Sequence, residues 1–308
     1  MDHIYTMPKN ILDENGIYEF ITLLYNTFNE TTNSKIILDF SSTNYINPNL
    51  MAPLGMVLTK LKSKNNDIAL RNLKIRVKKL LIKYGFLQTS QIPGDIIYQN
   101  YIKYESFNGD DPNGFEDYLN LQLAEISNEG IISTLTSHIM EIFVNVKTHA
   151  RTNEKRSRFK NKEIFTSGYY NENQNYIRFS ICNNGKSFCE NISSKLNYNF
   201  SNEYEYINWS LKEKNTTKNA SPGGLGLYML SNLVNICKGT LIILSGKGYY
   251  ELSYSKKIND FKLMCKDFSS SFPGTVVTIK LPLILIPENK IIHNDITIDI
   301  LSLLKGDL

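Results

Sequence analysis

A polar stripe on one predicted helix constrains this chain more than any other feature. Glu141, Asn145 and His149 are spaced four residues apart, and at 3.6 residues per turn such positions share one face of a helix. The opposite face is apolar, so the helix can be buried against a core. That apolar face carries Leu135, Ile139, Ile142, Phe143, Val146 and Ala150.

Two motifs follow this helix in chain order. The first is Asn183-Asn184-Gly185-Lys186-Ser187, and the second is Gly223-Gly224-Leu225-Gly226-Leu227. Glycines let a backbone approach phosphates closely, and a helix predicted from Leu225 to Cys237 would offer free N–H groups to those anions. Since Mg²⁺ prefers oxygen ligands, a carboxylate, an amide and a glycine loop together predict a site for a nucleotide phosphate and Mg²⁺.

The composition is that of a globular protein. The chain has 308 residues, 42% of them hydrophobic, and a formal net charge of +4. This length allows two domains with substantial cores, and so small a charge gives no reason to expect nonspecific attraction to nucleic acid. The basic run from Arg151 to Lys162 is expected to be a solvated loop, with a docking or nucleic-acid surface as the alternative.

The cysteines and the apolar runs indicate a cytoplasmic protein. Cys182, Cys189, Cys237 and Cys265 form no C-x-x-C pair, which favours reduced thiols over a disulfide framework or a zinc site. No secretory signal and no apolar run of about 20 residues is visible, so we expect no membrane span.

Residues 1–107 predict a small α/β domain in which a parallel-leaning sheet is covered by helices. The expected strands are Ile36–Phe40 and Asp67–Leu70, and the expected helices are Met51–Leu61 and Leu73–Tyr84, the latter ended by Gly85. Residues 108–114 are rich in Gly, Pro, Asn and Asp and predict a linker.

Residues 115–286 predict a second domain, followed by a tail at 287–308. Its expected elements are a helix at Phe115–Glu129, strands at Ile164–Tyr170, Tyr176–Cys182 and Gly274–Leu281, and a hairpin of Thr240–Leu244 with Tyr249–Tyr254. Residues Cys189–Pro222 have weak periodicity and suit a long mobile loop.

With these motifs in this order, residues 115 to 285 resemble the GHKL (Bergerat-fold) ATP-binding domain of gyrase B, histidine kinases, mismatch-repair ATPases and anti-sigma-factor kinases. The resemblance implies a two-layer α/β sandwich that binds ATP and Mg²⁺. Glu141 would act as the catalytic base, and Asn145 would hold the metal. The other implied nucleotide contacts are His149, Asn183, Gly185, Ser187, Gly223, Gly224, Leu225, Gly226, Leu227 and Thr275.

Two positions depart from the family pattern. Asn183 stands where the family has an adenine-reading Asp. A hydrogen bond to a charged group is worth about 1.5–3 kcal/mol against about 1 for a neutral one, so affinity for ATP would fall roughly tenfold. Ser187 replaces the motif's second glycine, and a left-handed conformation there would be strained.

The N-terminal domain resembles a STAS domain of the anti-sigma-antagonist type. The order of strand, polar turn and helix matches, but Asn47-Pro48-Asn49-Leu50 stands where regulated members have Asp-Ser-Ser-Gly. Because the phosphoacceptor serine is missing, the resemblance implies docking rather than self-phosphorylation.

Together the two resemblances predict an ATP- and Mg²⁺-binding regulatory protein, in which a lid at Cys189–Pro222 and the STAS-like domain control a protein partner. Slow ATP hydrolysis is one expectation. A protein serine kinase acting on a partner and a scaffold that binds nucleotide without hydrolysis are the alternatives, and a homodimer is allowed.

Overall fold

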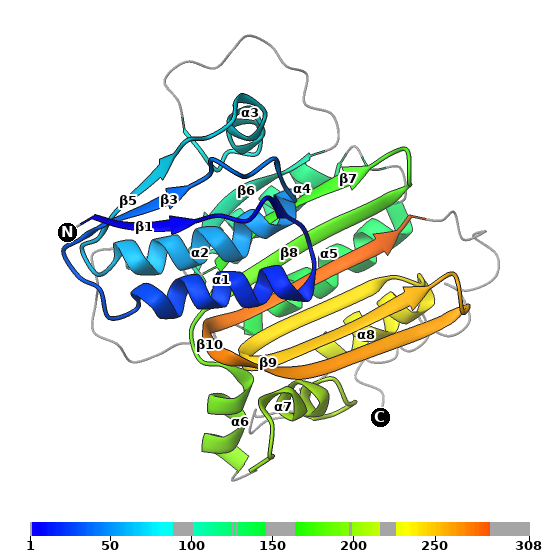
Figure 1. The fold of residues 1–308 in the computed structure, drawn as a ribbon. Coiled ribbons are helices and arrows are strands. Elements are labelled where there is room, and N and C mark those ends of the chain that lie inside the picture. The colour runs from blue at the N-terminus through cyan, green and yellow to red at the C-terminus, as the bar shows by residue number, and fades with distance from the viewer. Residues whose placement is uncertain are drawn as a thin grey trace.

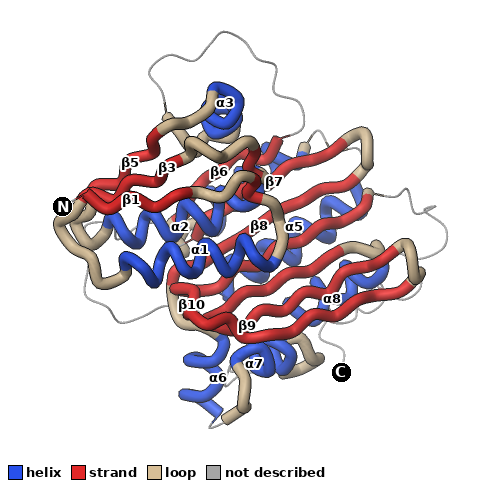
Figure 2. The backbone as a smooth tube through the Cα atoms, viewed as in Figure 1, coloured by secondary structure: helices blue, strands red, loops and turns tan. Residues whose placement is uncertain are grey.

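The computed structural model describes residues 2–88, 101–124, 126, 129–145, 164–196, 199–215 and 226–283. It shows a mixed α/β protein that contains both parallel and antiparallel sheets (Figures 1 and 2). Several predictions lie outside the described residues. These predictions concern Val146, His149 and Ala150 on the predicted helix, the basic run at 151–162, residues 223–225 of the glycine motif, and the tail at 287–308.

The N-terminal unit is built on a parallel sheet of order β1-β3-β5. Strands β3 and β5 and helices α2 and α3 confirm the predicted elements, and Gly85 ends α3 with a φ of +73°. Strand β1 and helix α1 were not predicted. The bounds are β1 Asp2–Thr6, β2 Asn10–Ile11, α1 Asn15–Phe28, β3 Lys35–Asp39, β4 Tyr45–Ile46, η1 Pro48–Leu50, α2 Met51–Lys62, β5 Asp67–Arg71 and α3 Ile75–Lys83.

The second unit is built on an antiparallel sheet of order β6-β7-β8-β10-β9. Helices α4, α5 and α8 cover one face of it, where their apolar side chains share a core with alternate strand residues. The bounds are β6 Tyr101–Phe107, α4 Pro112–Leu123, α5 Glu129–Asn145, β7 Ile164–Asn171, β8 Tyr176–Asn184, α6 Phe188–Leu196, α7 Glu203–Ser210, α8 Gly226–Ile236, β9 Thr240–Ser255 and β10 Asp260–Pro282.

Strand β6 belongs to this large sheet, because it pairs with β7. The boundary predicted after residue 107 therefore separates β6 from the sheet to which it belongs. The turn-forming composition of 108–114 marks the start of α4 instead: Asp111 Oδ1 accepts a 3.0 Å hydrogen bond from the Gly114 N–H, and Pro112 occupies the first turn.

The hairpin predicted around Gly246 is wrong, because β9 runs through it as one strand. Gly246 has a φ of +60° and lies opposite a register irregularity in β10, so the backbone bends there without reversing. The chain reverses instead at residues 256–259, where Asn259 adopts a φ of +51°.

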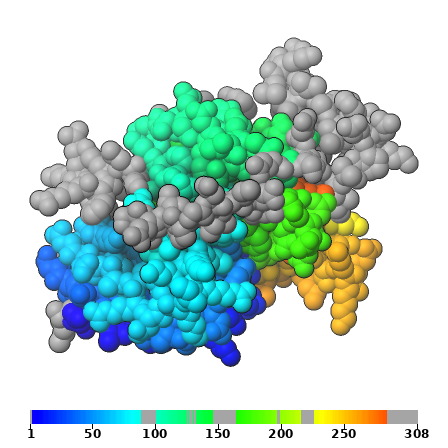
Figure 3. Space-filling model, turned by 90° about the horizontal axis from the view of Figure 1, so that it is seen from above, coloured from blue at the N-terminus to red at the C-terminus, as the bar shows by residue number. Residues whose placement is uncertain are grey.

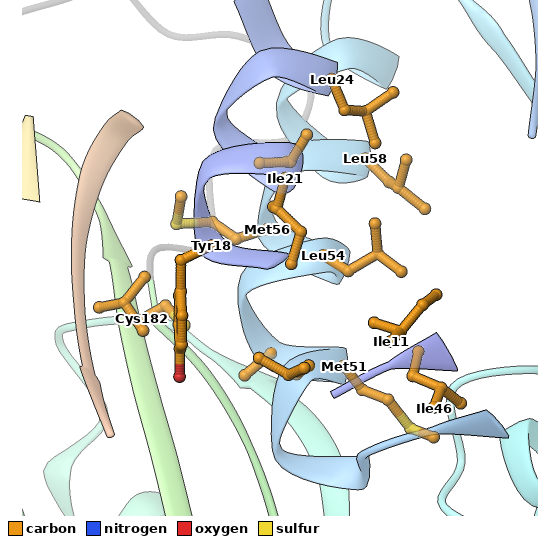
Figure 4. Packing of buried hydrophobic residues seen from close by; sticks show 14 of the residues in the cluster. Ile11, Tyr18, Ile21, Leu24, Ile46, Met51, Leu54, Met56, Leu58 and Cys182 are labelled. Atoms are coloured by element: carbon orange, nitrogen blue, oxygen red, sulfur yellow. The ribbon is translucent and has the colours of Figure 1, made fainter. Parts of the chain in front are cut away.

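The N-terminal unit covers the other face of the large sheet. Helices α1 and α2 lie on one side of the sheet and α5 and α8 on the other (Figure 1), and the view from above shows the N-terminal unit (blue and cyan) opposite the segment around α4 (Figure 3). One apolar core crosses this boundary and joins Tyr18 and Met51 to Cys182, Leu244 and Val276 (Figure 4 shows part of it).

Buried polar contacts cross the same boundary. Asn49 Nδ2 donates to Ser180 Oγ on β8 at 3.3 Å, and the Ala52 N–H donates to Ser167 Oγ on β7 at 2.9 Å. Asn49 is fully buried. The segment around Asn49 thus lies against the large sheet.

The loop expected at Cys189–Pro222 is largely helical in its first half. Helix α7 packs on β9 with Ile207 fully buried. Asp267 on β10 fixes the start of α7 by accepting hydrogen bonds of 2.8 and 2.9 Å from the N–H groups of Glu203 and Tyr204. Residues 197, 198 and 216–222 of the expected lid lie outside the described part.

None of the helices in the described part of the chain has the length and apolar character needed to cross a bilayer.

Candidate functional site

Glu141 and Gly226 are in direct contact. A Cβ placed on Gly226 would overlap Cγ of Glu141 and would lie 3.1 Å from its Cδ, so any larger residue would displace the carboxylate. Glu141 is half-buried on α5, and Gly226 is the first described residue of α8. The structure therefore brings the predicted helix motif against the end of the predicted glycine motif, which is far away in the sequence.

Packing of α5 against α8 produces this contact. The four described residues of the predicted apolar face, Leu135, Ile139, Ile142 and Phe143, are all buried, and they share a core with Leu230, Leu233 and Val234 of α8. Asn145 lies one turn beyond Glu141 at the end of α5 and is half-buried. Leu227 is partly buried against the same core.

Asn183 and Thr275 form the second predicted pair that the structure brings together. They lie directly opposite each other on β8 and β10, and opposite residues of an antiparallel pair project to the same face. Ile181 and Val277, two residues further along, belong to the core beneath α5 and α8. Because strand side chains alternate between faces, Asn183 and Thr275 lie on the face that carries Glu141 and Gly226.

Ser245 extends this polar row, and sequence reasoning missed it. It lies opposite Thr275 on β9, where the two hydroxyl oxygens are 2.7 Å apart, and its Oγ accepts a 2.9 Å hydrogen bond from the Phe188 N–H. This pair ends the regular register in which residues 275–280 of β10 face residues 240–245 of β9, and the irregularity in β10 begins beyond it. No local sequence signal marks such a register, so Ser245 reads in isolation as an ordinary strand residue.

Gly274 allows the close approach at this point. Its φ is +153°, a value that suits glycine, and an added Cβ would overlap the carbonyl oxygen of Asn183. The Gly274-Thr275 pair thus sets Thr275 beside Asn183.

The side-chain amide of Asn183 has an unused donor. The residue is only 8% exposed, and its buried Nδ2 has no hydrogen-bond partner in the described part of the chain. A buried donor left unpaired costs about 1–3 kcal/mol. A ligand that accepts a hydrogen bond here would remove that cost.

Ser187 is a helix cap, and the strain predicted for it is wrong. The residue is absent from the positive-φ positions of the described chain. Its Oγ accepts a 3.2 Å hydrogen bond from the Glu190 N–H, and Glu190 Oε2 accepts one of 2.7 Å from the Ser187 N–H. This reciprocal capping box begins α6, so Ser187 has a structural role at the start of that helix. Gly185 lies in the bend between β8 and α6.

Two titratable groups near these elements are shifted by burial. Desolvation lowers the pKa of His138, one turn before Glu141 on α5, to about 4. Desolvation also raises the pKa of Glu203, whose Oε2 accepts a 2.8 Å hydrogen bond from the Lys247 N–H. His138 is therefore neutral at neutral pH.

No protein-family model matches the sequence, and no curated protein is significantly similar to it.

Proposed function

We propose that this chain is an ATP- and Mg²⁺-binding regulatory protein with a GHKL-type site. The observation that carries the proposal is the contact between Glu141 and Gly226. A carboxylate against the first residue of a helix, with an amide one turn away, is an arrangement that suits a triphosphate and its metal. The buried, unpaired amide of Asn183 on the same sheet face adds a group suited to a base.

Each half of the site has its own role in this proposal. The N–H groups at the start of α8 bind phosphate oxygens, because a helix N-terminus favours anions. Asn145 holds Mg²⁺ through its amide oxygen, and the bound cation neutralises charge on the phosphates. Glu141 orients or deprotonates an attacking water or hydroxyl group. Asn183 and Thr275 bind the base.

The N-terminal unit acts as the regulatory part and docks through a STAS-like surface. Two observations support this role. Asn49 is fully buried and bonded to Ser180 on β8, three residues before Asn183. Met51 and Ala52 share a core with Cys182, the residue immediately before Asn183. The regulatory unit thus contacts the strand that carries the base-binding residue.

Titration calorimetry with ATP and Mg²⁺ tests the proposal. We expect millimolar or tighter binding by the full chain, loss of binding in Asn145→Ala, and retained binding in Glu141→Gln. If millimolar ATP gives no heat of binding and no shift in the melting temperature, the proposal is wrong. Radiolabelled ATP then separates the possible activities, since free phosphate indicates an ATPase, label on a partner indicates a serine kinase, and no turnover indicates a scaffold.

A further inference from the structure

The amide of Asn183 differs from a carboxylate in what it can offer to a base. A carboxylate only accepts hydrogen bonds, whereas an amide both donates through Nδ2 and accepts through Oδ1. In this structure the donor is the group left without a partner, on a side chain that is more than nine-tenths buried. The site therefore contains a polar group that an accept-only residue would not supply.

Purine bases differ in the hydrogen-bond donors and acceptors that they present at position 6 and N1. A 6-amino purine such as adenine presents a donor at position 6 and an acceptor at the neighbouring N1. A 6-oxo purine such as hypoxanthine presents an acceptor at position 6 and a donor at N1. A carboxylate accepts from the 6-amino group of the first pattern but offers no donor to its N1, and it repels the keto oxygen of the second. An amide matches both groups of either pattern after turning its two ends over.

The hydroxyl groups of Thr275 and Ser245 can also exchange their donor and acceptor roles. Either Ser245 or Thr275 can donate in the 2.7 Å hydrogen bond between them. When Ser245 donates, the Thr275 proton is left for a ligand acceptor. When Thr275 donates, its lone pairs are left for a ligand donor. Ser245 can play both parts while it accepts from the Phe188 N–H.

We propose that Asn183 gives this site a dual selectivity, so that it binds purine nucleoside triphosphates with either an amino or a keto group at position 6. The inference rests on the proposed nucleotide-binding function. It identifies Asn183 as the residue that sets base selectivity.

Inosine triphosphate is the probe that isolates this property, because it differs from ATP only at position 6 and N1. Calorimetry on the full chain with Mg²⁺ is expected to give dissociation constants for the two nucleotides within about tenfold of each other. Asn183→Asp is expected to raise the preference for ATP by roughly 10- to 100-fold, because a hydrogen bond to a charged acceptor is stronger and the keto oxygen is repelled.

Asn184→Asp is the matched control. It makes the same chemical change one residue along β8, but its side chain lies on the opposite face, where Lys60 Nζ donates to Asn184 Oδ1 at 2.8 Å. This variant should keep the wild-type ratio of the two affinities.

The outcomes are distinguishable. If the wild-type protein binds neither nucleotide, the proposed function itself is wrong. If it binds ATP more than about tenfold tighter than inosine triphosphate, or if Asn183→Asp leaves the ratio unchanged, only the dual selectivity is wrong. Circular dichroism checks that Asn183→Asp is folded, and the wild-type ratio alone decides the matter if it is not.

Discussion

Lys60 of the N-terminal unit holds the end of β8 through Asn184, at a Nζ–Oδ1 distance of 2.8 Å. Asn184 follows Asn183 directly and projects to the other face of the sheet. Helix α2, which carries Lys60, therefore contacts the end of β8 on the face of the sheet opposite to Asn183. This contact gives the N-terminal unit a direct connection to the proposed base-binding residue.

Replacing Lys60 should weaken nucleotide binding more than it weakens the fold. Lys60→Met keeps the aliphatic stem but removes the donor, so the end of β8 is less well positioned. We expect a three- to tenfold loss of ATP affinity, equivalent to about 0.6–1.4 kcal/mol, measured by calorimetry, and partial rescue by Lys60→Arg. Lys64→Met is the control, because Lys64 donates to the Asn29 carbonyl within the N-terminal unit. Equal losses in both variants would argue against a positioning role.

A side chain at residue 226 should displace Glu141. Gly226→Ala places a Cβ on top of Glu141 Cγ, and overpacking of this kind costs about 1–3 kcal/mol. Urea unfolding should show that loss, and calorimetry should show weakened ATP binding. The double variant Glu141→Ala with Gly226→Ala removes the overlapping Cγ and should recover most of the stability. A double variant no more stable than Gly226→Ala would show that the two residues do not contact each other.

Local sequence patterns predicted the helices and strands of this fold better than they predicted the long-range contacts between those elements. The apolar face of α5, the turn between β7 and β8 and the end of α3 at Gly85 follow from periodicity and turn chemistry that lie within a few residues. The proximity of Glu141 and Gly226 was expected from the chemistry of the two motifs and from the resemblance, since no local pattern pairs residues so far apart.

The wrong predictions involve long-range structure. Gly246 resembles a turn residue, but β10 pairs across it and keeps β9 continuous. Asp267 and β9 stabilise α7, whose own sequence has weak helical periodicity. Sheet membership of β6 depends on its pairing with β7. In each case the deciding partner lies many residues away.

Removing the hydroxyl of Tyr18 should loosen the contact between the two units. Tyr18 is fully buried, and its OH is 2.6 Å from Asp13 Oδ1 and 2.8 Å from Thr278 Oγ1 on β10. Tyr18→Phe leaves both partners without this bond at a cost of about 1–3 kcal/mol, which urea unfolding measures. Hydrogen exchange should rise in α1 as well as in β10. Tyr249→Phe is the control, because its hydroxyl bonds Glu251 within β9, and it should leave exchange in α1 unchanged.

Acid should destabilise the protein through His138. Burial lowers the pKa of this residue from 6.5 to about 4, so between these values the unfolded chain binds a proton that the folded chain does not. Stability is therefore full above pH 6.5 and falls as the pH drops toward 4, by at most about 3 kcal/mol. His138→Gln should flatten the dependence of the free energy of unfolding on pH across this window, measured by urea titration at several pH values. An unchanged slope in His138→Gln would assign the acid sensitivity to other groups.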